Sequence, residues 1–442
     1  MNETITLGAG VTGLTVGLSS RLPVYEAGEV PGGICSSYYI RPMESKRLYT
    51  LPSNDEVYRF EIGGGHWIFG ADSAVLHFIS RLTPTKSYTR RSSVYFPDKD
   101  LLVPYPIQNH LSYLGKEVAT QVINEILSAS RSDNSLTTMA EWIRAVFGKT
   151  LCRLFFEPFH DLYTARLWQQ IAPQDTYKSP IDLSCVIRGM FSQAHPVGYN
   201  ATFVYPVEGL SSLARRMAQR TRIHFGKQVI TIDVTRKEVY FSDGSSLGYK
   251  WLISSLPLNR MMEMTGLHVD AKPDPYTSIL VINIGAIKGP NCPKDHWLYI
   301  PNSKAGFHRV GFYSNVDVAF LHGSVRKNGN RVSIYVEKAY KGGEKWMDNN
   351  ELKFLCEAVV KELQEWGFID VAEVVDPTWI DVGYTWRWPN SVWRQCALDI
   401  LEKHGIYQVG RYGRWVFQGI ADSIRDGFVA GSGFMNLSEG KI

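Results

Sequence analysis

The sequence contains no apolar run of the roughly 18 residues that a transmembrane helix requires. It also lacks a basic block, and its 47 Lys and Arg residues nearly balance its 43 Asp and Glu residues. Neither a nucleic acid nor a membrane surface is therefore expected as a partner. No signal peptide precedes the first apolar segment, which indicates a cytoplasmic location.

Cysteine is scarce as well. The six cysteines are scattered, with no CxxC motif and no paired histidine spacing. This pattern argues against a metal site and against a disulfide framework, and it favours reduced thiols packed in the core. A chain of 442 residues is longer than one ordinary core allows, so two or three subdomains are expected.

The N-terminal stretch, by contrast, carries a strong pattern of glycines. Residues 5–7 predict a strand, residues 14–20 a helix, and Gly8, Gly10 and Gly13 lie between them in GxGxxG spacing. In a dinucleotide-binding turn these three glycines make the turn, admit a pyrophosphate to the backbone and pack the helix on the sheet. A flexible loop could use the same glycines, so the motif needs its context.

That context points to FAD. Glu26 ends the second predicted strand, where a carboxylate can accept both hydroxyls of a ribose. Gly32 and Gly33 follow, and their backbone amides could reach the same phosphates. NAD proteins do not need this second pair, whereas FAD proteins of the amine-oxidase type have it. The acid of this motif is expected about 20 residues after the glycines, and Glu26 follows Gly13 sooner than that. The helix between them is therefore shorter than usual.

A second glycine segment follows at residues 63–66. Three consecutive glycines, including Gly64 and Gly65, run into His66. Such a segment cannot be the interior of a strand, so its backbone must approach something flat or must move. Contact with a cofactor and a plain turn are the two interpretations.

The remaining chain predicts an α/β fold with mixed α+β character. Helices are expected at residues 73–83, 112–128, 138–147, 150–159, 351–366 and 421–430, and strands at 92–103, 200–206, 229–234, 278–287, 308–313 and 371–389. We expect a Rossmann-type FAD-binding domain made of residues 1–72, 200–270 and 395–442. A mainly helical substrate-binding subdomain would span 73–199, and an antiparallel-sheet substrate domain 271–394.

With these segments placed, the chain resembles the UDP-galactopyranose mutases, flavoproteins of the FAD amine-oxidase and protoporphyrinogen-oxidase-like superfamily. The resemblance extends over nearly the whole chain. The glycine motifs are shared across the superfamily and discriminate little. The more specific segments are Pro104-Tyr105-Pro106-Ile107-Gln108, Tyr163-Thr164 with Trp168, Phe307-His308-Arg309-Val310 and Gly410-Arg411-Tyr412-Gly413.

The resemblance implies an isomerase that interconverts the pyranose and furanose forms of a nucleotide sugar. In that family reduced FAD attacks the anomeric carbon through N5, the nucleoside diphosphate leaves, and the sugar opens and recloses on the flavin without net redox change. The implied reductant is NAD(P)H and the implied partner is a nucleotide-sugar substrate. The sequence does not determine whether the chain forms a homo-oligomer.

The resemblance also implies roles for single residues. Arg309 and Arg411 match the family's two diphosphate arginines, although either could be a plain surface arginine. His66, with Gly64 and Gly65, matches the mobile loop over the flavin. The implied cofactor contacts further include Val229 and Gly410, and the implied substrate contacts are Ile107, Gln108, Tyr163, Thr164, Trp168 and Asn200.

Three positions depart from the family pattern. Phe417 stands where members carry a tyrosine, Gly419 where bacterial members carry an acid, and Trp388 where a later tyrosine precedes a proline. The substrate is therefore expected to differ from UDP-galactopyranose. The alternative function is that of an FAD-dependent oxidoreductase of the amine or protoporphyrinogen oxidase type, although paired arginines would repel an amine.

Overall fold

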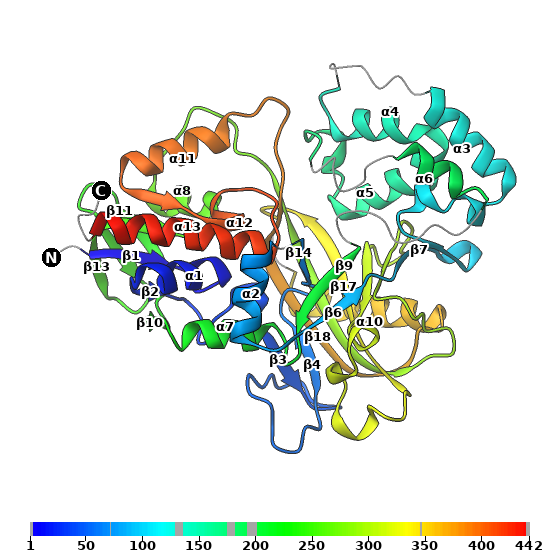
Figure 1. The fold of residues 1–442 in the computed structure, drawn as a ribbon, viewed down its shortest axis with the longest axis horizontal. Helices are drawn as coiled ribbons and strands as arrows, with labels where there is room; N and C mark the ends of the chain where they lie inside the picture. Colours follow the sequence, from blue (N-terminus) through cyan, green and yellow to red (C-terminus); the bar gives the residue numbers. More distant parts are fainter. Residues whose placement is uncertain are drawn as a thin grey trace.

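The structure, a computed structural model, describes residues 3–70, 72–128, 136–174, 182–191, 201–344 and 347–438. Two large sheets and a group of helices make up the molecule (Figure 1). The first sheet lies beside helices α1 (Val11–Ser20) and α13 (Ile420–Ser438), which pack against each other. The helical group lies at the opposite corner of the view, above the second sheet.

The first sheet joins segments that are far apart in the chain. Its strand order is β10-β2-β1-β13-β12-β11, and β19 pairs with β13. The pairs among β10, β2, β1, β13 and β19 are parallel, so the carboxyl end of β1 opens at the glycine turn. The strands are β1 (Glu3–Leu7), β2 (Val24–Tyr25), β10 (Ile223–His224), β11 (Val229–Asp233), β12 (Glu238–Phe241), β13 (Ser246–Ser254) and β19 (Ile406–Gln408).

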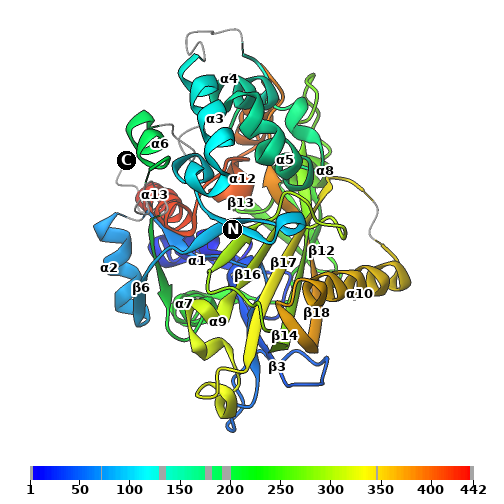
Figure 2. The ribbon, with the colours of Figure 1, turned by 90° about the vertical axis from the view of Figure 1, so that its right-hand side faces the viewer.

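The second sheet has the order β18-β14-β17-β16-β15-β7-β8, with antiparallel pairs except for β15 and β7. Helix α10 (Asn349–Glu365) flanks it, and its Val359 and Leu363 share a core with this sheet (Figure 2). The strands are β7 (Ser92–Phe96), β8 (Leu101–Pro104), β14 (Tyr276–Lys288), β15 (Trp297–Tyr299), β16 (Arg309–Phe312), β17 (Arg331–Lys341) and β18 (Ile369–Thr385).

The helical group consists of α3 (Lys116–Ser128), α4 (Met139–Leu151), α5 (Glu157–Tyr163) and α6 (Leu183–Arg188). A capping box of Thr138 and Glu141 begins α4. A π-helical segment, Cys152–Phe156, joins α4 to α5 and sets Phe155 and Phe156 into a core that the helical group shares with Val94, Phe96 and Val103 of the second sheet.

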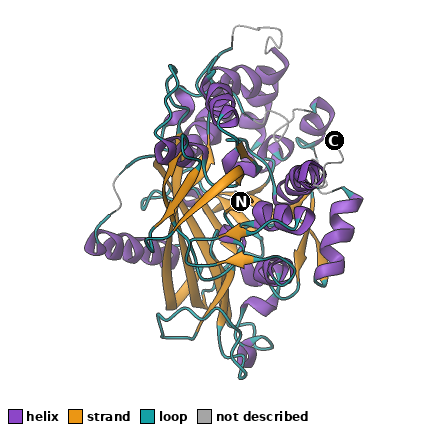
Figure 3. Ribbon diagram, turned by 90° about the vertical axis from the view of Figure 1, so that its left-hand side faces the viewer, coloured by secondary structure: helices purple, strands orange, loops and turns teal. Residues whose placement is uncertain are grey.

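Smaller elements connect these parts, and Figure 3 shows how loops and helices surround the strands. The strands β3 (Ser37–Ile40) and β4 (Tyr58–Glu61) form one pair, and β5 (Ile68–Phe69), β9 (Thr202–Pro206) and β6 (Thr85–Thr89) form a three-stranded sheet. The further helices are α2 (Ser73–Leu82), α7 (Leu210–Ala218), α8 (Leu258–Thr265), α9 (Tyr313–Val316), α11 (Trp393–Lys403) and α12 (Gly410–Gly413).

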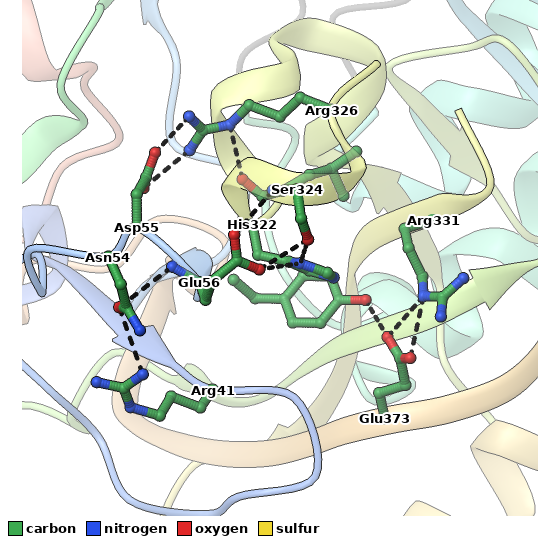
Figure 4. A network of polar contacts seen from close by, with 11 residues as sticks. Arg41, Asn54, Asp55, Glu56, His322, Ser324, Arg326, Arg331 and Glu373 are labelled. Atoms are coloured by element: carbon green, nitrogen blue, oxygen red, sulfur yellow. Dashed lines mark hydrogen bonds and ion pairs between the residues drawn. The ribbon is translucent and has the colours of Figure 1, made fainter. Parts of the chain in front are cut away.

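A polar network ties the β3–β4 connection to the second sheet (Figure 4). Arg326 pairs with Asp55 at 2.5 Å, and His322 lies 3.0 Å from Glu56. Arg331 of β17 donates to Glu373 of β18 at 2.9 Å. These contacts hold the long connection against the sheet at a place remote from the glycine turn.

The predicted fold class is confirmed. The hairpin expected over 92–103 is formed by β7 and β8, and the helix expected over 73–83 is α2. The closing helix extends to residue 438 rather than 430, because Gly427 and Gly431 lie within it, where a Cβ would meet backbone and side chains of α1. These glycines serve close helix packing and do not end the helix.

We expect Gly13→Ala to lower the free energy of unfolding by about 1–3 kcal/mol or more, because overpacking a rigid contact carries such a cost. A Cβ at Gly13 would lie 1.9 Å from the Gly8 carbonyl oxygen. Gly433→Ala in α13 is the matched control, since nothing lies within 4 Å of its Cβ, and it should be neutral or stabilising by up to about 1 kcal/mol. Urea denaturation of both variants measures the difference, and equal midpoints would contradict the packing role of Gly13.

Candidate functional site

One cavity of about 670 Å³ extends from the glycine turns of the first sheet to the helical group. Its volume lies within the range of ordinary ligand and cofactor sites. Predicted site residues on its wall are Gly8, Gly10, Glu26, Gly32, Gly33, Gly65, His66, Tyr163, Arg309, Arg411 and Phe417. The fold thus brings residues from both ends of the chain and from its middle to one space.

The glycine end of the cavity is a backbone cradle. Gly8 and Gly32 have φ of 90° and 110°, and Gly10 forms a bridge with Gly32. A Cβ at Gly10 would meet nothing within 4 Å, so that position faces open space. The Glu26 carboxylate accepts from the Ala9 N–H at 2.6 Å and stays at the edge of the cradle.

The loop of residues 63–66, called here the glycine loop, lies between the cradle and the second sheet. A Cβ at Gly65 would fall 2.0 Å from the Tyr335 hydroxyl oxygen, so the loop backbone packs directly on a strand of that sheet. His66 follows on the cavity wall, and its Nδ1 has no partner among the residues that the structure describes. Burial, and then the nearby Arg411 charge, lower the pKa of His66 to about 4, so it is neutral at pH 7.

The two arginines reach the cavity from different elements and are held differently. Arg309 of β16 donates through Nε and Nη2 to Glu337 of β17, at 2.9 and 2.5 Å. Arg411 of α12 donates only to carbonyl oxygens, those of Gln418 at 3.1 Å and Gly383 at 3.2 Å. In the described part of the chain no carboxylate lies within ion-pair distance of Arg411.

Glu337 is a site residue that sequence reasoning missed. Its side chain is 2% exposed, lines the cavity and faces Arg309 in the antiparallel register. Burial opposes its ionisation, but Arg309 and His308 outweigh that cost and lower its pKa to about 2. The signal available in the sequence was a single acid, Glu337, directly after the apolar stretch 334–336, since a carboxylate is rarely buried without a partner.

The far end of the cavity has an aromatic wall. Tyr163 of α5 packs edge-on against Tyr384, near the end of β18, and against Trp386 just after it, with ring centroids 4.9 and 5.5 Å apart. Trp142 and Phe155 of the helical group also line it. Of these residues, only Tyr163 was predicted. The others carry no local pattern that separates a cavity wall from ordinary core.

Four predicted substrate residues do not line the cavity. Thr164 and Trp168 are fully buried, and their polar groups bond within the helical group, to the His160 carbonyl at 2.7 Å and to Asp161 at 2.6 Å. Ile107 and Gln108 lie one layer behind Tyr105 and Pro106, which do line it. These four side chains are buried behind the cavity wall, and their direct contact with a substrate stays a prediction.

The other predicted residues within the described ranges lie off the cavity wall. Val229 pairs with Phe241 in β11, away from the cavity wall. Trp388 donates to the Pro273 carbonyl oxygen at 2.8 Å and lies under the Lys272 ammonium, whereas Trp386 faces the cavity. Gly13, Gly64 and Gly410 lie where an added Cβ would collide with a neighbour. Gly13 lets α1 pack on the glycine turn, Gly64 faces Glu337, and Gly410 faces Thr12. Asn200 lies outside the described residues.

Two further observations concern the described ranges. They hold no group of three or more His, Cys, Asp or Glu side chains placed to bind a metal ion. Among the helices found there, none has the length and hydropathy to cross a bilayer.

We expect the His66 imidazole to stay neutral from pH 8 down to about pH 5, because burial and two arginines oppose its protonation. NMR of protein labelled at histidine Cε1, with His66→Gln to assign the resonance, measures this titration. Free imidazole in the same buffer serves as the reference. A midpoint near the ordinary value of about 6.5 would show that His66 is exposed to water and charged near neutrality.

No protein-family model matches the sequence. Among solved structures the chain is similar to reduced UDP-galactopyranose mutase, with a TM-score of 0.81, 22% identity, and coverage of 100% of this chain and 96% of that one. A candidate protoporphyrinogen oxidase from Exiguobacterium sp. 255-15 has a TM-score of 0.68 at 13% identity, covering 100% and 99%. Putrescine oxidase bound to putrescine has 0.57 at 12%, covering 98% and 99%. The chain therefore has the fold that UDP-galactopyranose mutase shares with these oxidases.

Proposed function

We propose that the chain binds FAD noncovalently and acts, with the flavin reduced, as a nucleotide-sugar mutase that interconverts pyranose and furanose forms of an NDP-hexose. The observation that carries the proposal is the convergence of Arg309 and Arg411 on one cavity, between a glycine cradle and an aromatic wall. In this proposal the glycine cradle holds the pyrophosphate of FAD, the charged middle holds the diphosphate of the sugar nucleotide, and the aromatic wall holds its nucleobase.

The glycine end fits the dinucleotide. Gly8, Gly10, Gly32 and Gly33 leave bare backbone on the wall, as close approach to a pyrophosphate requires. Glu26 at the edge of the cradle would accept the ribose hydroxyls. Gly419, Ile420 and Ser423, at the start of α13, also line the cavity, so the positive end of that helix faces the flavin ring in this proposal.

The middle of the cavity fits a leaving diphosphate. Two guanidinium groups and one carboxylate leave a net charge of about +1 there, and fixed donors in a site shielded from water stabilise charge that develops as a bond breaks. Arg309 keeps its Nη1 edge outside the ion pair with Glu337. His66 is neutral, so the two arginines supply the positive charge that faces the anion in this part of the cavity.

Reduced FAD, when bound, would supply the nucleophile for the anomeric carbon. The protein residues would bind and orient the sugar nucleotide: the aromatic wall around Tyr163 and Trp142 would hold the nucleobase, and the arginines would hold the phosphates. NAD(P)H is the proposed reductant and the cytoplasm the proposed compartment. The oligomeric state is not part of the proposal.

Phe417 supports an altered substrate. Its ring lies 4.4 Å from the Arg411 guanidinium carbon and is parallel to Tyr384, so it shapes the diphosphate region without a hydroxyl. A lost hydrogen bond to a charged group costs roughly 1.5–3 kcal/mol. We infer weak activity on UDP-galactopyranose and better activity on another nucleotide sugar.

We expect purified protein to be yellow and Gly10→Ala to fold normally but to bind FAD about tenfold or more weakly. The added methyl group meets no protein atom within 4 Å but would crowd the cofactor, and overpacking costs about 1–3 kcal/mol. Flavin absorbance after reconstitution measures binding, and thermal unfolding of the apoprotein tests the fold. A wild-type protein that takes up no FAD would contradict the proposed function.

We expect dithionite-reduced protein to isomerise at least one member of a nucleotide-sugar panel without consuming reductant, and Arg411→Ala to slow turnover about 100-fold or more. Arg236→Ala is the control, because that side chain is 74% exposed in a distant turn. Liquid chromatography with mass spectrometry separates the isomers. Consumption of one NAD(P)H per turnover would instead favour the oxidoreductase of the amine or protoporphyrinogen oxidase type.

A further inference from the structure

Glu337 lies beside Arg309, His308 and the glycine loop at once. Besides the ion pair with Arg309, one of its oxygens lies 3.6 Å from Nε2 of His308. Its Oε1 faces Gly64 of the glycine loop so closely that an added Cβ on Gly64 would meet it. No other described carboxylate on the cavity wall makes both an arginine pair and a loop contact.

The ion pair with Glu337 fixes which edge of the Arg309 guanidinium group faces a ligand. The antiparallel register sets Arg309 opposite Glu337, so both side chains project from the same face of the second sheet. Glu337 takes the Nε and Nη2 edge of the guanidinium, and the planar fork leaves Nη1 as the edge that a ligand can use. A shift of the carboxylate would therefore turn that edge.

The contact with the glycine loop leaves no free space. A Cβ at Gly64 would lie 2.9 Å from Glu337 Oε1, and the φ of Gly64 is 78°, a backbone conformation that favours glycine. The carbonyl oxygen of Gly64 accepts from the His66 N–H at 2.8 Å. Movement of Gly64 would thus move both His66 and the carboxylate.

We propose that Glu337 is a positioning residue that couples the glycine loop to Arg309, so that the position of the loop and the binding of a diphosphate by Arg309 depend on each other. The proposal rests on the proposed function only in taking a diphosphate as the ligand. Coupling runs in both directions, because linkage between two sites is reciprocal. Arg411, held by two carbonyl oxygens, lies outside this unit.

Hydrogen exchange of the peptide that spans residues 61–68, with and without saturating inorganic pyrophosphate, tests the coupling. In wild-type protein the ligand should slow exchange of this peptide about fivefold or more. In Glu337→Gln, which keeps the shape but loses the charge, saturating pyrophosphate should no longer slow exchange of this peptide.

Glu373→Gln is the matched control. Glu373 also pairs with an arginine, Arg331, at 2.9 Å and is largely buried, but it lies in the network of Figure 4 and not on the cavity wall. This variant should keep both the affinity for pyrophosphate and the slowed exchange of the loop peptide. Loss of the effect in both variants would indicate a general loosening of the sheet and would overturn the specific role of Glu337.

Glu337→Asp separates the two contacts and serves if the Gln variant does not fold. It keeps a negative charge beside Arg309 but withdraws the carboxylate from Gly64, so pyrophosphate should still bind, although more weakly than to wild type, while exchange of the loop peptide no longer responds. The proposal would be overturned if pyrophosphate slowed exchange of the loop peptide in a Glu337 variant as much as in wild type. It would also be overturned if pyrophosphate left the exchange of this peptide unchanged in the wild-type protein. The measurement needs no turnover and no flavin, so failure of the proposed function is recognised separately, by flavin uptake and the sugar panel.

Discussion

The ion pair between Arg309 and Glu337 is the interaction on which the rest of the site depends. Burying a carboxylate or a guanidinium group costs free energy unless a partner of opposite charge lies beside it. The antiparallel pairing of β16 and β17 brings both groups together as soon as the sheet forms. The site is thus assembled by sheet register rather than by a flexible loop.

This constraint makes the two arginines unequal. Arg309 is neutralised and held at one edge, whereas Arg411 is held by carbonyl oxygens and by the rings of Phe417 and Tyr384, 4.4 and 5.5 Å from its guanidinium carbon. Arg411 therefore supplies most of the uncompensated positive charge. Arg309 presents one fixed edge of its guanidinium group to the cavity, and neutral His66 adds no positive charge to those of the two arginines.

Close packing at glycines joins the cofactor end to this charged middle. Gly13 lets α1 approach the turn, Gly64 admits the Glu337 carboxylate, and Gly65 admits the Tyr335 hydroxyl. Each is a position where even a methyl group would displace a neighbour. The cavity therefore has rigid backbone on one side and aromatic side chains of the helical group on the other.

The sequence by itself determined the fold class, and its short motifs singled out the glycine cradle, Glu26 and the two arginines, which line one cavity and whose roles stay predictions. It did not determine which aromatic residues face the cavity: Trp168 and Trp388 were expected there, but Trp142 and Trp386 line it. Nor did it identify Glu337, which lies 28 residues after Arg309 and meets it only through strand pairing. Those outcomes were decided by the tertiary structure, since the direction of a side chain and the register of two strands depend on neighbours distant in the chain.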